Sequence, residues 1–194
     1  MEKLSTILML YLLPLAIAMP MARGFDKQPG AVQAWFENLS NLKEKVSRIH
    51  FYIHDIMGGK NPTTFVVAEA NISATSATYF GLIKMMDIPI RVGPEPDSKI
   101  IGQIQGINGA SSFEEIGLLL NFNFLFTEGE YNGSTLSILG HESELEDYRE
   151  MPIVGGTGVF RLARGIVTSH TISINNTFEE IFAEVTAVVS YYVG

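Results

Sequence analysis

Three charged side chains of this sequence have the chemistry of an acid–base site. Asp55 and Glu142 are carboxylates, and Arg149 carries a planar guanidinium fork that can bind a carboxylate or another oxyanion. A carboxylate held in apolar surroundings can exchange protons near neutral pH, and two neighbouring carboxylates can divide the roles of acid and base. Asp55, Glu142 and Arg149 are therefore the candidate catalytic residues.

Each of the three also has an ordinary structural explanation. Asp55 ends a strand-like run and can cap the Gly58-Gly59 turn. Glu142 begins an acidic stretch that reaches Asp147, and such runs usually lie in solvent. Arg149 can form an ion pair with that stretch, which is compatible with a site. The residues alone leave both readings open.

Several other chemistries lack their residues. The chain has no cysteine, which excludes thiol nucleophiles and thiolate metal sites. His54 and His141 could carry protons, but no histidine spacing indicates zinc and no Gly-x-Ser-x-Gly elbow is present. The glycine-rich segment 149–165 lacks phosphate-loop spacing and predicts a tight turn between strands. We expect neither a metal nor a cofactor.

Charge and the N-terminus limit the partners and the location. The net charge is −8 and basic residues do not cluster, so nucleic acid and anionic membranes are not expected partners. Residues 1–22 read as a secretory signal peptide, because the apolar run 7–18 is too short to cross a bilayer. We expect a flexible arm over 23–47, with a helical turn within 31–42, and one domain over 48–194. Four sequons are candidate glycosylation sites: Asn38, Asn71, Asn132 and Asn175.

The rest of the chain alternates as short strands do. Ile49, Phe51 and Ile53 alternate with polar residues, and Phe122 and Phe124 lie on one face of the strongest strand. Strands are predicted at 49–53, 63–73, 79–87, 99–107, 116–127, 135–139, 159–171 and 181–192. About eight short strands indicate a sandwich or a barrel, and a closed barrel removes the sheet edges. Inward phenylalanines are core residues first, although some can also form the wall of a ligand site.

Several motifs together resemble one family. In order they are Phe51-Tyr-Ile-His-Asp-Ile56, Gly59-Lys-Asn-Pro-Thr63, Gly93-Pro-Glu-Pro96, Gln105-Gly106, Tyr131-Asn-Gly-Ser-Thr-Leu136 and the segment 149–165. They resemble the plant dirigent proteins from about residue 50 to residue 165. The wording is most similar to the b/d-type branch, and the cysteine pair usual in the lignan-forming branch is missing.

The resemblance implies an all-β protein, an eight-stranded antiparallel barrel of the allene-oxide-cyclase-like kind, that forms a homotrimer. It also implies a secreted glycoprotein of the apoplast or cell wall. Family members hold phenoxy radicals, made by a separate laccase or peroxidase, so that coupling has one handedness without oxidation by the protein itself. Some b/d-type relatives instead dehydrate isoflavanols to pterocarpans. Both activities pass through quinone-methide-like species.

The same resemblance assigns positions in the cavity. Asp55 and Arg149 match cavity residues of the family, whereas Glu142 stands where the lignan-forming branch has Asp and the b/d-type branch has Asn. Asp87 is expected in the cavity or in a turn, and Asn108 replaces a frequent Tyr. The expected substrate-binding residues are His54, Asp87, Asn108, Phe122 and Phe124.

Overall fold

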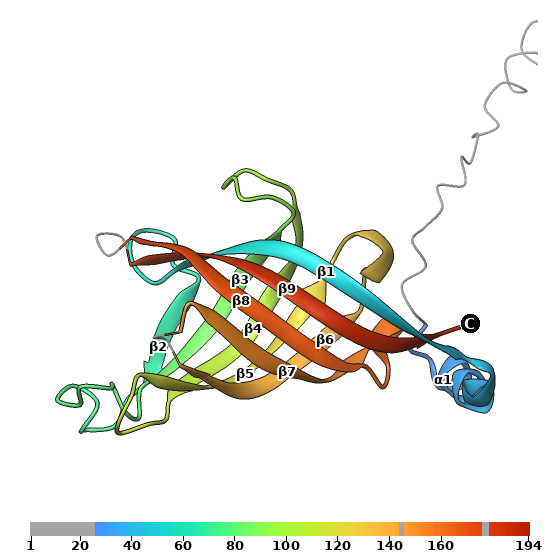
Figure 1. The fold of residues 1–194 in the computed structure, drawn as a ribbon, viewed down its shortest axis with the longest axis horizontal. Coiled ribbons are helices and arrows are strands. Elements are labelled where there is room, and N and C mark those ends of the chain that lie inside the picture. Colours follow the sequence, from blue (N-terminus) through green and yellow to red (C-terminus); the bar gives the residue numbers. More distant parts are fainter. Residues whose placement is uncertain (1–25, 144–145, 176–178) are drawn as a thin grey trace, which may run out of the picture.

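A computed structural model shows a single β-barrel and describes residues 26–143, 146–175 and 179–194. Its strands are β1 (Lys43–Ile56), β2 (Thr64–Ala68), β3 (Ile83–Arg91), β4 (Ile100–Ala110), β5 (Gly117–Phe126), β6 (Thr135–Ser143), β7 (Tyr148–Thr157), β8 (Arg164–Asn175) and β9 (Glu180–Val193). Every registered pair of strands is antiparallel, in the order β1-β9-β8-β7-β6-β5-β4-β3-β2. Figure 1 shows helix α1 (Pro29–Glu37) and the C-terminus at one end, and β2 with long loops at the other.

The barrel closes where β1 meets β3. Their register contains Tyr52↔Arg91 and Ile53↔Ile90. Beyond this point β2 replaces β1 beside β3, with Thr64 opposite Met86. Eight long strands therefore form the closed barrel that the sequence predicts, and the short β2 extends its open end.

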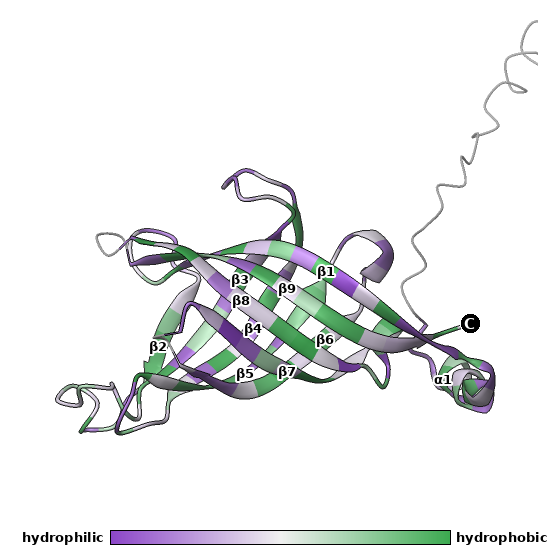
Figure 2. Cartoon of the chain, in the orientation of Figure 1, coloured by the Kyte–Doolittle hydropathy of each residue, from purple (hydrophilic) through white to green (hydrophobic). Residues whose placement is uncertain are grey.

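Strand alternation divides the barrel into an inner and an outer face, visible in Figure 2 as alternating colours along the strands. The end nearest α1 is filled by aromatic rings. Phe160 is fully buried, with ring centroids 4.9 Å from Tyr131, 5.1 Å from Tyr191 and 5.8 Å from Phe126. Burial raises the pKa of the Tyr131 hydroxyl, so it stays protonated at ordinary pH. This packing closes one end of the barrel.

The glycine-rich segment differs from the sequence prediction. Residues 148–157 form strand β7, which carries the predicted turn only at its end. The register with β6 shifts by one residue near Val154, and the chain turns at Gly158, where φ is +67°. A Cβ at Gly156 would lie 2.7 Å from the Cβ of Phe160. The glycines therefore let the turn bring Phe160 over the end of the barrel.

The N-terminal segment is attached to the closed end. The predicted helical turn is helix α1, and β1 begins at Lys43, inside the segment predicted as an arm. The Arg161 guanidinium lies 5.2 Å from the ring centroid of Trp35, and its Nη2 donates to the carbonyl of Asp26. The predicted signal peptide lies outside the described residues.

The four sequon asparagines are spread over the surface. Asn38 caps the C-terminus of α1, Asn71 is exposed in the loop after β2, and Asn175 ends β8. Asn132 and Gly133 form the turn before β6, with the Ser134 amide donating to the Tyr131 carbonyl. No helix among the described residues has the length and apolar character needed to cross a bilayer.

The aromatic closed end should carry much of the stability. We expect Phe160→Ala to lower the free energy of unfolding by about 3–5 kcal/mol, because it leaves a cavity that rigid neighbours cannot fill. Phe36→Ala is the matched control, since Phe36 is 62% exposed on α1. Urea unfolding measures both, and equal losses for the two variants would contradict the role of Phe160.

Candidate functional site

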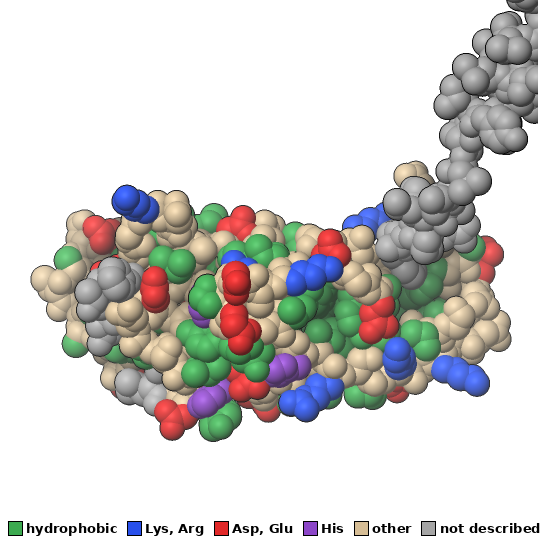
Figure 3. All heavy atoms as spheres, turned by 90° about the horizontal axis from the view of Figure 1, so that it is seen from above, with side chains coloured by type: hydrophobic (Ala, Val, Ile, Leu, Met, Phe, Trp, Pro, Cys, Tyr) green, Lys and Arg blue, Asp and Glu red, His purple; other side chains and the backbone are tan. Residues whose placement is uncertain are grey.

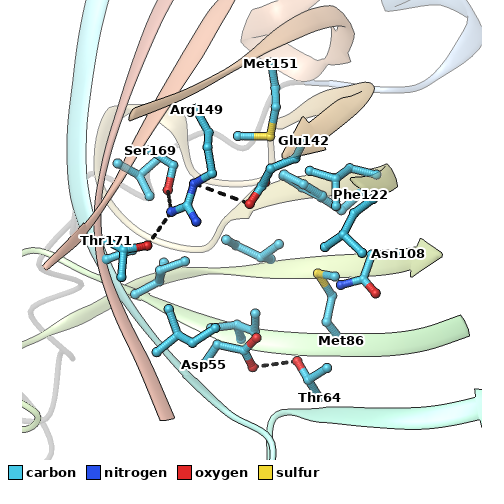
Figure 4. Close-up of a pocket in the computed structure, with 18 of the residues that line it drawn as sticks. Asp55, Thr64, Met86, Asn108, Phe122, Glu142, Arg149, Met151, Ser169 and Thr171 are labelled. Atoms are coloured by element: carbon cyan, nitrogen blue, oxygen red, sulfur yellow. Dashed lines mark hydrogen bonds and ion pairs between the residues drawn. The ribbon is translucent and has the colours of Figure 1, made fainter. Parts of the chain in front are cut away.

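The open end of the barrel contains a cavity of about 500 Å³. Both apolar and charged side chains line it, and the charged and polar ones come from opposite walls (Figure 4). Leu120, Phe122, Met151 and Val167 are among the apolar lining residues. An apolar cavity of this size with a few placed polar groups is the usual form of a small-molecule site.

Asp55 stands on the first wall, at the end of β1. The hydroxyls of Thr64 and Thr63 donate to the same carboxylate oxygen, Oδ1, at 2.6 and 3.0 Å. The Thr63 amide also donates to Ile56, and its carbonyl accepts from Asp87. The seam between β1 and β2 therefore fixes the carboxylate, and Figure 4 shows its second oxygen turned toward the cavity. This oxygen is available to accept a proton or a hydrogen bond from a ligand.

Arg149 stands on the opposite wall, on β7, and is only 9% exposed. Its Nη2 donates to Thr171 Oγ1 at 2.6 Å and to Ser169 Oγ at 3.2 Å, both on β8. Its Nε lies 3.3 Å from Glu142 Oε1, an ion-pair distance without the alignment of a hydrogen bond. Glu142 thus compensates the charge of Arg149, and the hydroxyls fix the plane of the guanidinium beside the cavity.

A third polar group of the cavity comes from β3 and β4. Lys84 and Asn108 are register partners on these strands, and both line the cavity. They also line a side pocket of about 130 Å³ with Leu118, which borders both spaces. The Lys84 ammonium lies 3.5 Å from the sulfur of Met57, a weak acceptor.

The structure brings most of the predicted site residues together. Asp55, Glu142, Arg149, Asn108, Phe122 and Phe124 all line the cavity. Glu142 is therefore a cavity residue paired with Arg149, not merely part of a solvated acidic run. Within the described chain, no group of three or more His, Asp and Glu side chains is arranged to hold a metal.

His54 was predicted to bind substrate, but the structure places it outside the cavity. It alternates with Ile53 and Asp55 along β1 and so lies on the outer face, with its ring centroid 4.4 Å from that of Phe182. Burial, and to a lesser extent the charge of Arg91, lowers the pKa of His54. Figure 3 shows histidine side chains beside acidic ones on this outer surface.

Asp87, expected in the cavity or in a turn, lies in neither, because it is in the middle of β3 and faces outward. Met86 and Ile88 point inward from β3, so Asp87 between them is exposed outside the barrel and accepts a hydrogen bond from Gln105 Nε2 at 3.2 Å. The backbone amide of Asp87 donates to the Thr63 carbonyl and so helps to hold the start of β2.

Several polar cavity residues were not predicted, among them Thr64, Lys84, Ser169 and Thr171. For Lys84 a signal existed, because Met86, Ile88 and Ile90 set an inward phase that includes position 84. Thr64 contacts Asp55 only after β2 has replaced β1 at the seam, and the sequence contains no local sign of that contact.

The fold agrees with comparisons to known proteins. The profile of the Dirigent-like protein family matches residues 46–190. The chain belongs to the dirigent family. Dirigent protein 11 of Arabidopsis thaliana is 43% identical over 79% of this chain and 75% of its own length. Pterocarpan synthase 1 of Glycyrrhiza echinata is 44% identical over 77% of this chain and 80% of its own length.

Solved structures show the same barrel in this family. That of the pterocarpan synthase dirigent protein GePTS1 superposes with a TM-score of 0.74 at 43% identity, covering 78% of this chain and 93% of its own. That of PsPTS1 has a TM-score of 0.70 at 43% identity, covering 77% and 97%. The dirigent relatives thus include both dirigent proteins named only as such and pterocarpan synthases.

The Glu142–Arg149 pair yields a prediction about stability. Glu142→Gln removes the compensating charge beside a guanidinium that is almost fully buried, so the free energy of unfolding should fall by about 1–3 kcal/mol. Glu128→Gln, which breaks the exposed pair with Lys99, should change it by less than about 1 kcal/mol. Urea titrations compare the two, and an equal, small effect would mean that the cavity pair is solvated.

The lowered pKa of His54 yields a prediction about pH. Because the folded protein binds the His54 proton more weakly than the unfolded chain does, protonation favours unfolding. This contribution to stability is complete above the usual value of 6.5 and declines as the pH falls through the folded pKa. His54→Gln should therefore lose less stability than the native chain between pH 7.5 and 5. Parallel curves of unfolding free energy against pH would contradict this.

Proposed function

We propose that this dirigent protein binds a phenolic compound in its barrel and controls the handedness of a reaction that passes through a quinone methide. The observation that carries this proposal is the fixed Asp55 carboxylate, with one oxygen held by two hydroxyls and the other facing an apolar cavity. Arg149 on the opposite wall supplies a cation beside the same cavity. Such an arrangement can both orient a phenol and move its proton.

The geometry favours loss of water from a phenolic alcohol as the reaction. Asp55 Oδ2 accepts the phenolic proton, and the ring electrons expel a benzylic hydroxyl as a quinone methide forms. The hydroxide released takes this proton from Asp55 and leaves as water. A second hydroxyl of the substrate then adds to one face of the quinone methide, and its proton passes to the ring oxygen, which restores the phenol. Arg149 holds an oxygen of the substrate during these steps. The resemblance to pterocarpan synthases supports this form of the proposal.

Directed coupling of two phenoxy radicals is the second candidate. It is favoured by the size of the cavity, about 500 Å³, and by the equal similarity of Dirigent protein 11. A laccase or peroxidase would supply the radicals, and the protein would supply position. Asp55 would then accept the proton released when a hydroxyl closes onto the coupled quinone methide.

Assembly and location belong to the same proposal. Secretion to the apoplast and glycosylation are supported by the leader sequence and by the exposed sequon asparagines Asn38, Asn71 and Asn175. A homotrimer is supported by exposed apolar side chains on the outer face of β3 to β6, namely Ile83, Met85, Ile107, Leu119 and Leu139.

One pair of incubations separates the two reactions. The purified protein is given an isoflavanol without oxidant and, separately, a monolignol with a laccase, and the products are resolved by chiral chromatography. Turnover without oxidant supports dehydration, whereas one-handed product only with laccase supports directed coupling. Racemic or absent product in both incubations would contradict the proposed function for these substrates.

The active incubation then tests Asp55. Asp55→Asn keeps the shape of the side chain but removes its basicity. In the dehydration assay the rate should fall by about 100-fold or more. In the coupling assay the enantiomeric excess should fall. Asp87→Asn is the same change on the outer face and should leave both unchanged. If Asp55→Asn retains full activity, Asp55 is not the base.

A further inference from the structure

Of the two cations that line the cavity, Lys84 is the one with neither a carboxylate partner nor hydroxyl partners in the described part of the chain. Arg149 is paired with Glu142, and Asp55 is held by threonine hydroxyls. Within the described chain the Lys84 ammonium has one polar contact, the thioether sulfur of Met57, although the residue is half-buried in the wall. A partly desolvated ammonium is stabilised by an anionic partner, and the cavity offers space for one.

Asn108 adds hydrogen-bonding capacity beside this charge. It lies directly across the strand pair from Lys84, and its amide points into the cavity (Figure 4). No hydrogen bond of its side chain is recorded among residues 26–143, 146–175 and 179–194. An ammonium with three donors and an amide with two can bind the same oxyanion.

The chemistry of aromatic ligands identifies that oxyanion. A phenol resembles tyrosine, with a pKa near 10, and is neutral at pH 7, whereas a carboxylic acid with a pKa of about 4 is ionised. Next to Asn108 in the register is Leu120, and Phe122 follows it along the inner face of β5. A flat ring can therefore lie on this apolar wall while its carboxylate reaches Lys84.

Two acidic residues of the cavity rim oppose an anion. Glu146 and Asp147 also line the cavity, but both are exposed, so solvent and salt screen their repulsion. Lys84 lies in the wall itself, where a direct contact is screened less. The attraction between Lys84 and a bound anion is therefore stronger than the screened repulsion from Glu146 and Asp147.

We propose that Lys84 and Asn108 form a carboxylate subsite, so that the barrel prefers an aromatic acid to the corresponding neutral alcohol. This inference rests on the proposed function, since it takes the ligand to be a phenolic, and it adds the acid group to the substrate class. The subsite lies on β3 and β4, whereas Asp55 lies on β1 and Arg149 on β7.

Binding of two matched probes at pH 7 tests the proposal. 4-Hydroxycinnamate and 4-hydroxycinnamyl alcohol differ only in the terminal group, and calorimetry measures the affinity of the native protein for each. We expect the acid to bind about tenfold more tightly, the usual scale of one charged contact. Lys84→Met should remove this preference by weakening the acid alone, and Asn108→Leu should weaken it in part.

Two further variants control for charge and for folding. Lys84→Arg keeps the cation and should keep the preference for the acid. Lys99→Met removes an exposed lysine that pairs with Glu128 and should behave as the native protein does. Thermal unfolding of every variant shows that the barrel is intact.

The outcomes separate this inference from the function on which it rests. Equal affinity of the native protein for the two probes, or equal weakening of both by Lys84→Met, overturns the carboxylate subsite and leaves the phenolic cavity in place. Binding of neither probe contradicts both the subsite and a cavity that accepts simple phenols.

Discussion

The cavity depends on how the sheet closes between β1 and β3. The recorded register joins these strands through two residue pairs, and beyond them β2 takes the place of β1. The change of partner leaves the end of β1 beside the start of β2, and the hydroxyls of Thr63 and Thr64 reach Asp55 there. The feature that completes the barrel therefore also positions its best-fixed carboxylate. A barrel closed by one uninterrupted strand pair would lack these donors.

The two ends of the barrel interior differ in composition and in role. At the end nearest α1, Phe160 and its aromatic neighbours bury apolar surface, the main source of folding free energy. At the loop end, charged groups occupy the inner face, where desolvation opposes them. The Glu142–Arg149 pair, with the hydroxyls of Ser169 and Thr171, limits that cost. The stable end thus supports the end of the barrel that carries the polar groups of the cavity.

The sequence predicts features that depend on local alternation and misses those that depend on distant strands. The phase of β1 places Asp55 inside, and that of β5 does the same for Phe122 and Phe124. The same alternation along β1 places His54 on the outer face, so the sequence itself already argues against His54 as a cavity residue. Strand β7 was hidden because Pro152 and the glycines resemble a turn, and only the pairing with β6 and β8 makes it a strand. The hydroxyl contacts of Asp55 arise where the barrel closes between β1 and β3, and the pairing of these distant strands leaves no periodic pattern in the sequence.

The closed end of the barrel also limits how a molecule can reach the cavity. Because aromatic rings fill that end in the described part of the chain, the cavity opens toward the loop end. In a cavity with one opening, the molecule that enters last lies between the opening and the molecule that entered first. If two molecules were joined inside the cavity, the larger product would have to leave through the opening that had admitted each molecule separately. The size of this opening therefore limits the size of a molecule that can leave the cavity.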